Sequence, residues 1–261
     1  MPNEKVAQLA ARFRDPKDLK RQSNPDLKEM TATLDELRAM GADGVTSLVD
    51  LLKPDVEGGD VHVRHILHAQ AMRASGWPEK DRQAFTNALV GTLKADHPKS
   101  VKGYVIRQLQ VAGGAEVTAA LGEWLLDNDL WEDAAQVLLA IGDTAEQFLK
   151  ALPKAKGKQL LTIVQALGVL KVNNAVKRLR ELVTTEDAIL RQVAAWALAN
   201  MAESVGVWSV MGDAFGRAGG TLSKMLWSAL AEGHAAGGDL RGSSSAAILI
   251  AGRDKIGRAH V

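Results

Sequence analysis

Small and apolar residues recur along the chain at one fixed spacing, which is typical of amphipathic helices. In the clearest case Arg191 is followed three, four, six and seven positions later by Ala194, Ala195, Ala197 and Leu198. These offsets lie on one face of an α-helix. The same frame starts at six anchor residues, which are Arg64, Lys102, Trp131, Leu160, Arg191 and Ser223. Successive anchors are 29 to 38 residues apart, and a period of this size is typical of stacked helical hairpins.

A second amphipathic segment lies between successive anchors. These segments are residues 45–52, 85–93, 117–126, 145–152 and 175–183. Gly113-Gly114, Gly142 and Asn173-Asn174 separate the segments as turn signals, and residues 143–146 look like a capping box that opens a helix. No useful stretch alternates with the period of a strand. We therefore predict an all-α fold, an α-α superhelix of about six helical hairpins.

One repeat unit resembles a known family. Its motif consists of Asp187, Leu190-Arg191 and the run from Ala194 to Ala199. This unit resembles the bacterial HEAT-like repeats first named in phycobilisome lyases, and residues 138–143 and 165–168 are similar to parts of it. The resemblance covers roughly residues 42–240 and implies a HEAT-like solenoid, while it says little about function. Trp131 and Leu160 stand where these repeats usually carry a basic anchor.

The repeat array is expected to lie between two terminal segments that do not belong to it. Residues 1–41 do not fit the repeat, and apolar faces such as the one from Val6 to Phe13 predict an N-terminal helical cap. Residues 42–254 then form the repeat array, which we expect to be truncated at its C-terminal end. The last six residues, Ile-Gly-Arg-Ala-His-Val, resemble translated sequencing-adapter DNA. We therefore interpret residues 255–261 as a non-native tail.

Composition and charge exclude several classes of site. The chain has 32 Lys and Arg against 31 Asp and Glu, so a net charge of +1 does not support a nucleic-acid or membrane tether. It contains no Cys, which excludes disulfides, thiolate metal sites and a Cys nucleophile. The first 14 residues do not form a signal peptide, and no stretch reaches the ~18 apolar residues of a membrane span. We predict a cytoplasmic monomer.

Few residues occur in a pattern typical of a catalytic, cofactor-binding or metal site. His62, His65 and His68 are spaced three apart, but no Asp or Glu follows in that helix to complete a metal site. No phosphate-binding glycine loop or nucleophile motif is present. Trp196 and Trp227 lie among small residues and are expected in the core. The sequence thus predicts no catalytic, cofactor or metal residues, and no enzyme.

The strongest local signal is a pair of charge blocks. Residues 116–146 contain eight acids and no base, and residues 150–180 contain eight bases and no acid. The blocks can neutralise each other across the stack, which we favour, or they can steer a charged partner. The expected partner-binding residues are Lys154, Lys156, Lys158, Lys177, Arg178 and Arg180, together with Trp131 as an exposed aromatic.

Two functions are compatible with these patterns. The first is a non-enzymatic scaffold that presents a concave helical surface to a protein partner. The alternative is a nucleic-acid-binding module, or an enzyme of the lyase or glycosylase type, on the same scaffold. The basic block and Trp131 motivate this alternative. The near-neutral net charge speaks against nucleic acid as the partner.

Overall fold

In the computed structural model, residues 3–13, 27–54 and 59–205 are described, and all regular structure within these ranges is helical. The all-α prediction is therefore confirmed. The elements are α1 (Glu4–Ala11), α2 (Leu27–Ala39), α3 (Gly41–Asp50), α4 (Val61–Ala74), α5 (Glu79–Leu93), α6 (Lys99–Ala112), α7 (Ala115–Trp124), α8 (Trp131–Ile141), α9 (Ala145–Ala151), α10 (Gly157–Val169), the 3₁₀ turn η1 (Asn173–Ala175), α11 (Val176–Leu182) and α12 (Ala188–Val205). The chain divides into two compact units, Met1–Thr144 and Ala145–Val261.

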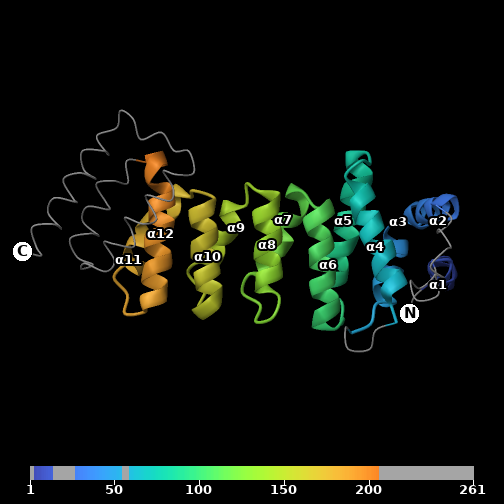
Figure 1. Ribbon diagram of the computed structural model, residues 1–261, viewed down its shortest axis with the longest axis horizontal. Coiled ribbons are helices and arrows are strands. Elements are labelled where there is room, and N and C mark those ends of the chain that lie inside the picture. The colour runs from blue at the N-terminus through green and yellow to red at the C-terminus, as the bar shows by residue number, and fades with distance from the viewer. Residues whose placement is uncertain (1–2, 14–26, 55–58, 206–261) are drawn as a thin grey trace, which may run out of the picture. The chain divides into compact units, whose positions relative to one another are not determined.

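The helices of the first unit pack in two layers (Figure 1). One layer contains α4, α6 and α8, each in contact with the next, and the other contains α3, α5 and α7. Contacts between α5 and α6 and between α7 and α8 join the layers. Helices α1 and α2 pack against α3 and α4. Within each layer, neighbouring helices are therefore two helices apart along the chain.

In the second unit, α10 lies beside α12, and α9 and α11 pack against α10 and α12 respectively. Helices α10 and α12 are in close contact at Gly168 of α10. A Cβ atom at this position would lie 2.7 Å from Ala197 Cα and 3.2 Å from Trp196 Cζ3. Glycine therefore permits the contact between α10 and α12. Trp196 is half-buried against this glycine, so the expectation that it lies in the core is met only in part.

The predicted helical frame describes the core well. At the five anchors within the described ranges, the residues three, four, six and seven positions on are buried, with the exception of His68. His68 is exposed, and its Nδ1 lies 3.0 Å from Gln108 Oε1. The frame that starts at Ser223 lies outside the described residues. In the N-terminal segment, the apolar face from Val6 to Phe13 is also buried, as expected.

An aspartate recurs four residues before three of the anchors. Asp127 Oδ1 accepts hydrogen bonds from the backbone N–H groups of the residues two and three positions on, at 2.9 and 3.0 Å. Asp187 makes the same two bonds at the start of α12, also at 2.9 and 3.0 Å. The bonds of Asp187 satisfy amides that the start of α12 leaves free, whereas those of Asp127 order the turn before α8. Asp60 instead accepts hydrogen bonds from Lys53 N and Arg64 Nε. These bonds connect the segment before α4 to the first turns of that helix.

The expected capping box at residues 143–146 is wrong. Helix α9 begins at Ala145, and the Thr144 hydroxyl donates to Leu138 O at 2.8 Å instead of accepting from the new helix. The side chain of Glu146 reaches forward to Lys150, at 2.6 Å, and not back to the helix start. The positive φ angles of Gly142 and Asp143, 74° and 49°, turn the chain so that Thr144 is buried beneath the end of α8.

None of the helices in the described ranges combines the length and hydropathy that a bilayer crossing requires. The predicted non-native tail at residues 255–261 and Trp227 both lie outside the described residues.

Candidate functional site

The basic residues predicted to bind a partner lie in the second unit, on two stretches. Lys154 follows α9, Lys156 is the N-cap residue of α10, and Lys158 is the second residue of that helix. All three side chains are exposed. Positive charge at a helix N-terminus is unfavourable beside the helix dipole, so these lysines do not stabilise the start of α10.

The other three residues, Lys177, Arg178 and Arg180, lie on α11 and are also exposed. Leu179 and Leu182 of the same helix are buried, which leaves the basic positions on its outer face. Arg178 pairs with Glu181 at 2.7 Å. Among the side chains that the structure describes in residues 145–201, no ion pair engages the other five cations of the predicted set. Residues 145–201 hold nine bases and four acids.

Trp131 belongs to the first unit, where it is the first residue of α8. Its side chain is half-buried rather than fully exposed. The expectation of an exposed aromatic at this anchor is therefore met only in part. The predicted site residues are thus divided between the two units.

Three acids of the acidic block pair with bases that precede the block in the sequence. Asp129 pairs with Lys99, Asp133 with Arg107 at 3.1 Å, and Glu116 with Arg82 at 2.8 Å. All six partners lie in the first unit. These three acids are therefore neutralised within their own unit by bases outside the basic block.

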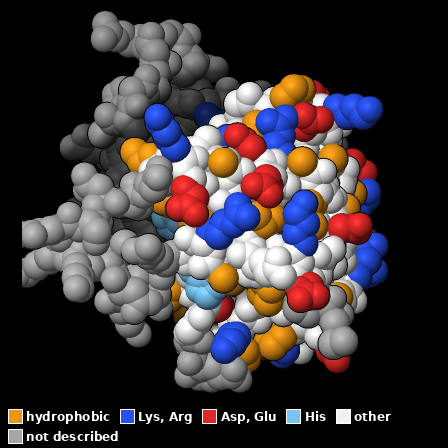
Figure 2. Space-filling model, turned by 90° about the vertical axis from the view of Figure 1, so that its right-hand side faces the viewer, with side chains coloured by type: hydrophobic (Ala, Val, Ile, Leu, Met, Phe, Trp, Pro, Cys, Tyr) orange, Lys and Arg blue, Asp and Glu red, His pale blue; other side chains and the backbone are white. Residues whose placement is uncertain are grey.

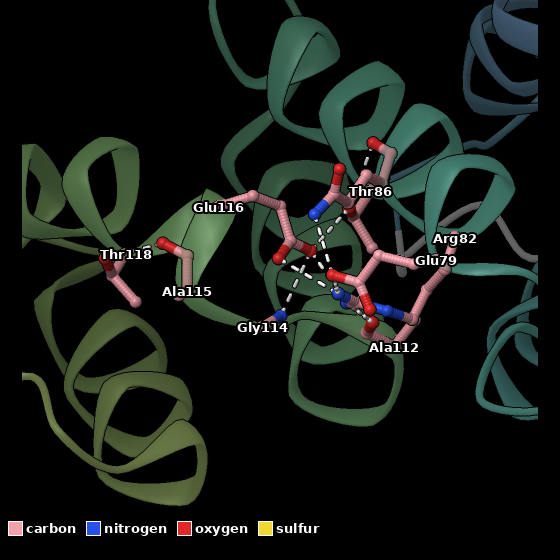
Figure 3. A network of polar contacts seen from close by, with 9 residues as sticks. Glu79, Arg82, Thr86, Ala112, Gly114, Ala115, Glu116 and Thr118 are labelled. Carbon is pink, nitrogen blue, oxygen red and sulfur yellow. Dashed lines mark hydrogen bonds and ion pairs between the residues drawn. The ribbon is translucent and has the colours of Figure 1, made fainter.

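The pair of Arg82 and Glu116 is the centre of a polar network between α5 and the turn from α6 to α7 (Figure 3). Arg82 Nη1 and Nη2 donate to the two carboxylate oxygens of Glu116 at 2.8 and 3.2 Å. Thr86 Oγ1 and Gly114 N donate to the same carboxylate at 2.8 and 3.1 Å. Arg82 Nη1 also donates to Ala112 O at 2.9 Å. The network therefore ties three helices together.

Arg82 and Glu116 each stabilise the ionised form of the other. Burial disfavours the ionised form of Glu116, but the hydrogen bonds from Arg82 and Thr86 outweigh burial and hold the pKa of the carboxyl below its ordinary value of 4.5. The hydrogen bond to Glu116 raises the pKa of Arg82 above its ordinary range. Both groups are ionised and paired near neutral pH, which indicates a structural role for the network.

The histidines of α4 do not converge on one point. The ring of His65 packs against Phe13, with 6.0 Å between centroids, and His68 contacts Gln108. In the part of the chain that the structure describes, no group of three or more His, Asp or Glu side chains is placed to hold a metal ion.

A cavity of about 600 Å³ in the first unit was not predicted from the sequence. Helices α2, α3, α4 and α5 surround it, and its lining includes Arg38, Gln70, Trp77 and Asp81. These residues come from segments that are far apart in the sequence, so they form no sequence motif. On the end of the first unit drawn in Figure 2, acidic and basic side chains are interspersed with apolar ones.

Comparison with known proteins identifies one family. Residues 106–260 match the model of a family described as a family of unknown function, DUF1028. No curated protein sequence matches the chain significantly.

Proposed function

This chain belongs to the family of unknown function DUF1028, and we propose that it is a non-enzymatic scaffold that binds an acidic polypeptide through the basic residues of its second unit. The proposed architecture is a HEAT-like stack of helical hairpins, an α-α superhelix with residues 1–41 as its N-terminal cap. A monomeric state and a cytoplasmic location stay predictions.

Repeated local structure supports the HEAT-like architecture. The anchor frame is buried in five helices whose anchors are 29 to 38 residues apart. Asp127 and Asp187, each four residues before an anchor, accept the same pair of backbone hydrogen bonds, from the residues two and three positions on. Arg64 and Arg191, two basic anchors, donate to backbone carbonyls of the segment before their own helix. Each of these contacts is made by equivalent positions of different hairpins, as expected of a repeat.

The observation that carries the proposed function is the uncompensated charge of the second unit. Lys154, Lys156, Lys158, Lys177 and Arg180 are exposed, and none has an ion-pair partner among the described side chains of residues 145–201. In the first unit, by contrast, acids such as Glu116, Asp129 and Asp133 are paired. Exposed cations without ion-pair partners raise the association rate and the specificity for an acidic partner.

The first test is a charge reversal of Lys154, Lys156 and Lys158 to Glu. A fluorescent glutamate-rich peptide should bind the unaltered chain in a salt-sensitive manner. The triple variant should bind at least about tenfold more weakly, because steering and local attraction are both lost. Fluorescence anisotropy at several salt concentrations measures this difference.

A matched control separates local from total charge. Lys5, Lys80 and Lys94 are exposed residues of the first unit, and their reversal to Glu changes the net charge by the same amount. This control should retain peptide binding. Equal loss of binding in the two triple variants would indicate a nonspecific effect of total charge and would count against the basic residues as the binding surface.

Reversal of Lys177, Arg178 and Arg180 to Glu tests whether the basic block has a purely structural role. Because α11 exposes these side chains, the free energy of unfolding should change by no more than the ~0.5 kcal/mol of ordinary surface substitutions. Chemical denaturation measures this value. A larger loss that added salt restores would show that the block stabilises the fold by neutralising acids.

A nucleic-acid-binding module is the second candidate, since phosphates would also be attracted to these cations. Duplex DNA is the probe that separates the two functions. Salt-sensitive binding of the duplex at low micromolar protein, lost on reversal of Lys154, Lys156 and Lys158, would favour the nucleic-acid function if the acidic peptide binds more weakly.

A further inference from the structure

The cavity of the first unit is lined by buried apolar side chains and by the partly exposed charged side chains of Asp35, Arg38 and Asp81. Val45, Leu48 and Phe85 are among its buried lining residues. Its volume of about 600 Å³ is within the range of small-molecule sites, roughly 300 to 1,000 Å³. Helix α2 packs against α3 and α4, and the cavity lies where the side chain of Arg38 reaches from α2 toward α5.

Arg38 is held in place by two contacts. Its Nη2 donates to Asp81 Oδ2 at 2.5 Å, and its guanidinium carbon lies 4.4 Å from the centroid of the Trp77 ring. Trp77 in turn packs edge-on against Phe85, at 5.6 Å between centroids. A guanidinium has five N–H donors, and among the described residues only one hydrogen bond engages Arg38. The remaining donors are therefore available to an anion, and the side chain is already oriented.

Gln70 adds an acceptor without a partner. It lines the cavity with only 3% of its surface exposed. Its Nε2 donates to Leu34 O at 2.6 Å, while its Oε1 has no hydrogen-bond partner among the described residues. Buried side-chain oxygens are nearly always hydrogen-bonded, and the N–H group of a ligand would provide such a partner here.

The charges around the cavity allow an anionic ligand. The two acids of the lining, Asp35 and Asp81, are paired with Arg73 at 2.6 Å and with Arg38. These four side chains together are neutral, so an incoming carboxylate meets no net negative charge. The lining groups that can still form hydrogen bonds are thus the remaining N–H donors of Arg38 and one amide acceptor, Gln70 Oε1.

We propose that this cavity binds an N-acylated apolar amino acid with a free carboxylate, which is also the chemistry of the C-terminal residue of a polypeptide. The apolar side chain occupies the space beside Leu48 and Phe85. The carboxylate accepts hydrogen bonds from Arg38, and the acylated N–H donates to Gln70 Oε1. This site lies in the first unit and does not depend on the proposed basic surface of the second.

Titration calorimetry of the full chain with matched ligands tests the proposal. N-acetyl-leucine should bind at least about tenfold more tightly than N-acetyl-leucinamide, in which a neutral carboxamide replaces the carboxylate. It should also bind more tightly than 4-methylpentanoate, which has the same apolar group and carboxylate but no N–H. These comparisons use the unaltered protein. Equal affinity for the acid and the amide, or no binding of N-acetyl-leucine at millimolar concentration, would overturn the proposal.

Variants then assign the contact. Arg38→Met should abolish the preference for the acid over the amide. Arg12→Met should preserve it, because Arg12 pairs with Glu36 of α2 but does not line the cavity. An unchanged preference in Arg38→Met would contradict the assignment of the carboxylate to Arg38. The triple reversal of Lys154, Lys156 and Lys158 should leave this binding intact, so failure of one proposal does not affect the other.

A pentapeptide that ends in leucine distinguishes the two sources of this chemistry. Tighter binding of the pentapeptide than of N-acetyl-leucine would identify a polypeptide C-terminus as the ligand. Tighter binding of N-acetyl-leucine would identify a free N-acyl amino acid, and both results would support the proposed chemistry.

Discussion

Gly168→Ala is expected to destabilise the second unit by about 1–3 kcal/mol, the usual cost of an overpacked interior. Alanine is the better helix former by roughly 1 kcal/mol, so a simple propensity argument gives the opposite sign. The new Cβ, however, would lie 2.7 Å from Ala197 Cα and 2.8 Å from its Cβ. These atoms belong to the body of α12 and cannot rotate away. Helices α10 and α12 must therefore separate.

Gly91→Ala is the matched control, since this glycine also lies within a helix but has no atom within 4 Å of the added Cβ. It should stabilise the protein by about 0.5–1 kcal/mol. Denaturant unfolding of both variants measures the two effects. If Gly168→Ala is as stabilising as Gly91→Ala, the close contact between α10 and α12 is absent.

The second large effect is expected for Glu116→Gln, which should lower the free energy of unfolding near neutral pH by about 2–3 kcal/mol. The side chains of Arg82 and Glu116 are only 16% and 13% exposed. Removal of the carboxylate charge leaves the guanidinium partly buried beside a neutral amide. Thr86 and Gly114 also lose a charged acceptor. Glu123→Gln, at an exposed position of the same helix, should change stability by less than ~0.5 kcal/mol.

The effect of Glu116→Gln should depend on pH with a definite sign. Because folding lowers the pKa of Glu116 below 4.5, its stabilising contribution is complete above the pKa of the unfolded state. The contribution is lost as the pH falls through the lower pKa of the folded state. The difference between the unaltered chain and the variant should thus shrink below about pH 4.5. A difference that grows on acidification would contradict the assigned pairing.

The helices and much of the core could be predicted from the sequence because helical periodicity is a local property. The anchors at Arg64, Lys102, Trp131, Leu160 and Arg191 each start a frame that turned out to be buried, apart from His68. The turns at Gly113-Gly114 and Gly142 were also placed correctly. These features depend on residues within about two helical turns of each other.

The side-chain partners were not predictable in the same way. Glu116 is paired with a residue 34 positions earlier, and Arg38 meets Asp81 at a separation of 43. Which of several bases an acid meets depends on helix packing, and no local pattern encodes it. The capping box failed for a related reason, since Thr144 has a tertiary partner, Leu138 O, that competes with the start of its own helix.

Charge composition alone also left the role of the basic block open. Equal numbers of acids and bases in neighbouring blocks are compatible with neutralisation and with steering. The pairing of Asp129 with Lys99 and of Asp133 with Arg107 uses bases that lie before the acidic block. Glu146 pairs with Lys150 and so uses a base of the basic block, while the pairing of Asp129 and Asp133 outside that block is the reason for proposing steering.

The most direct test of the proposed scaffold is affinity capture from the native host with three forms of the full chain. These are the unaltered chain, the variant with Lys154, Lys156 and Lys158 reversed to Glu, and the control with Lys5, Lys80 and Lys94 reversed. We predict that the unaltered chain and the control retain the same acidic polypeptide, that salt releases it, and that the first variant fails to retain it. Recovery of no polypeptide above background, or equal recovery by all three forms, would contradict the proposed function.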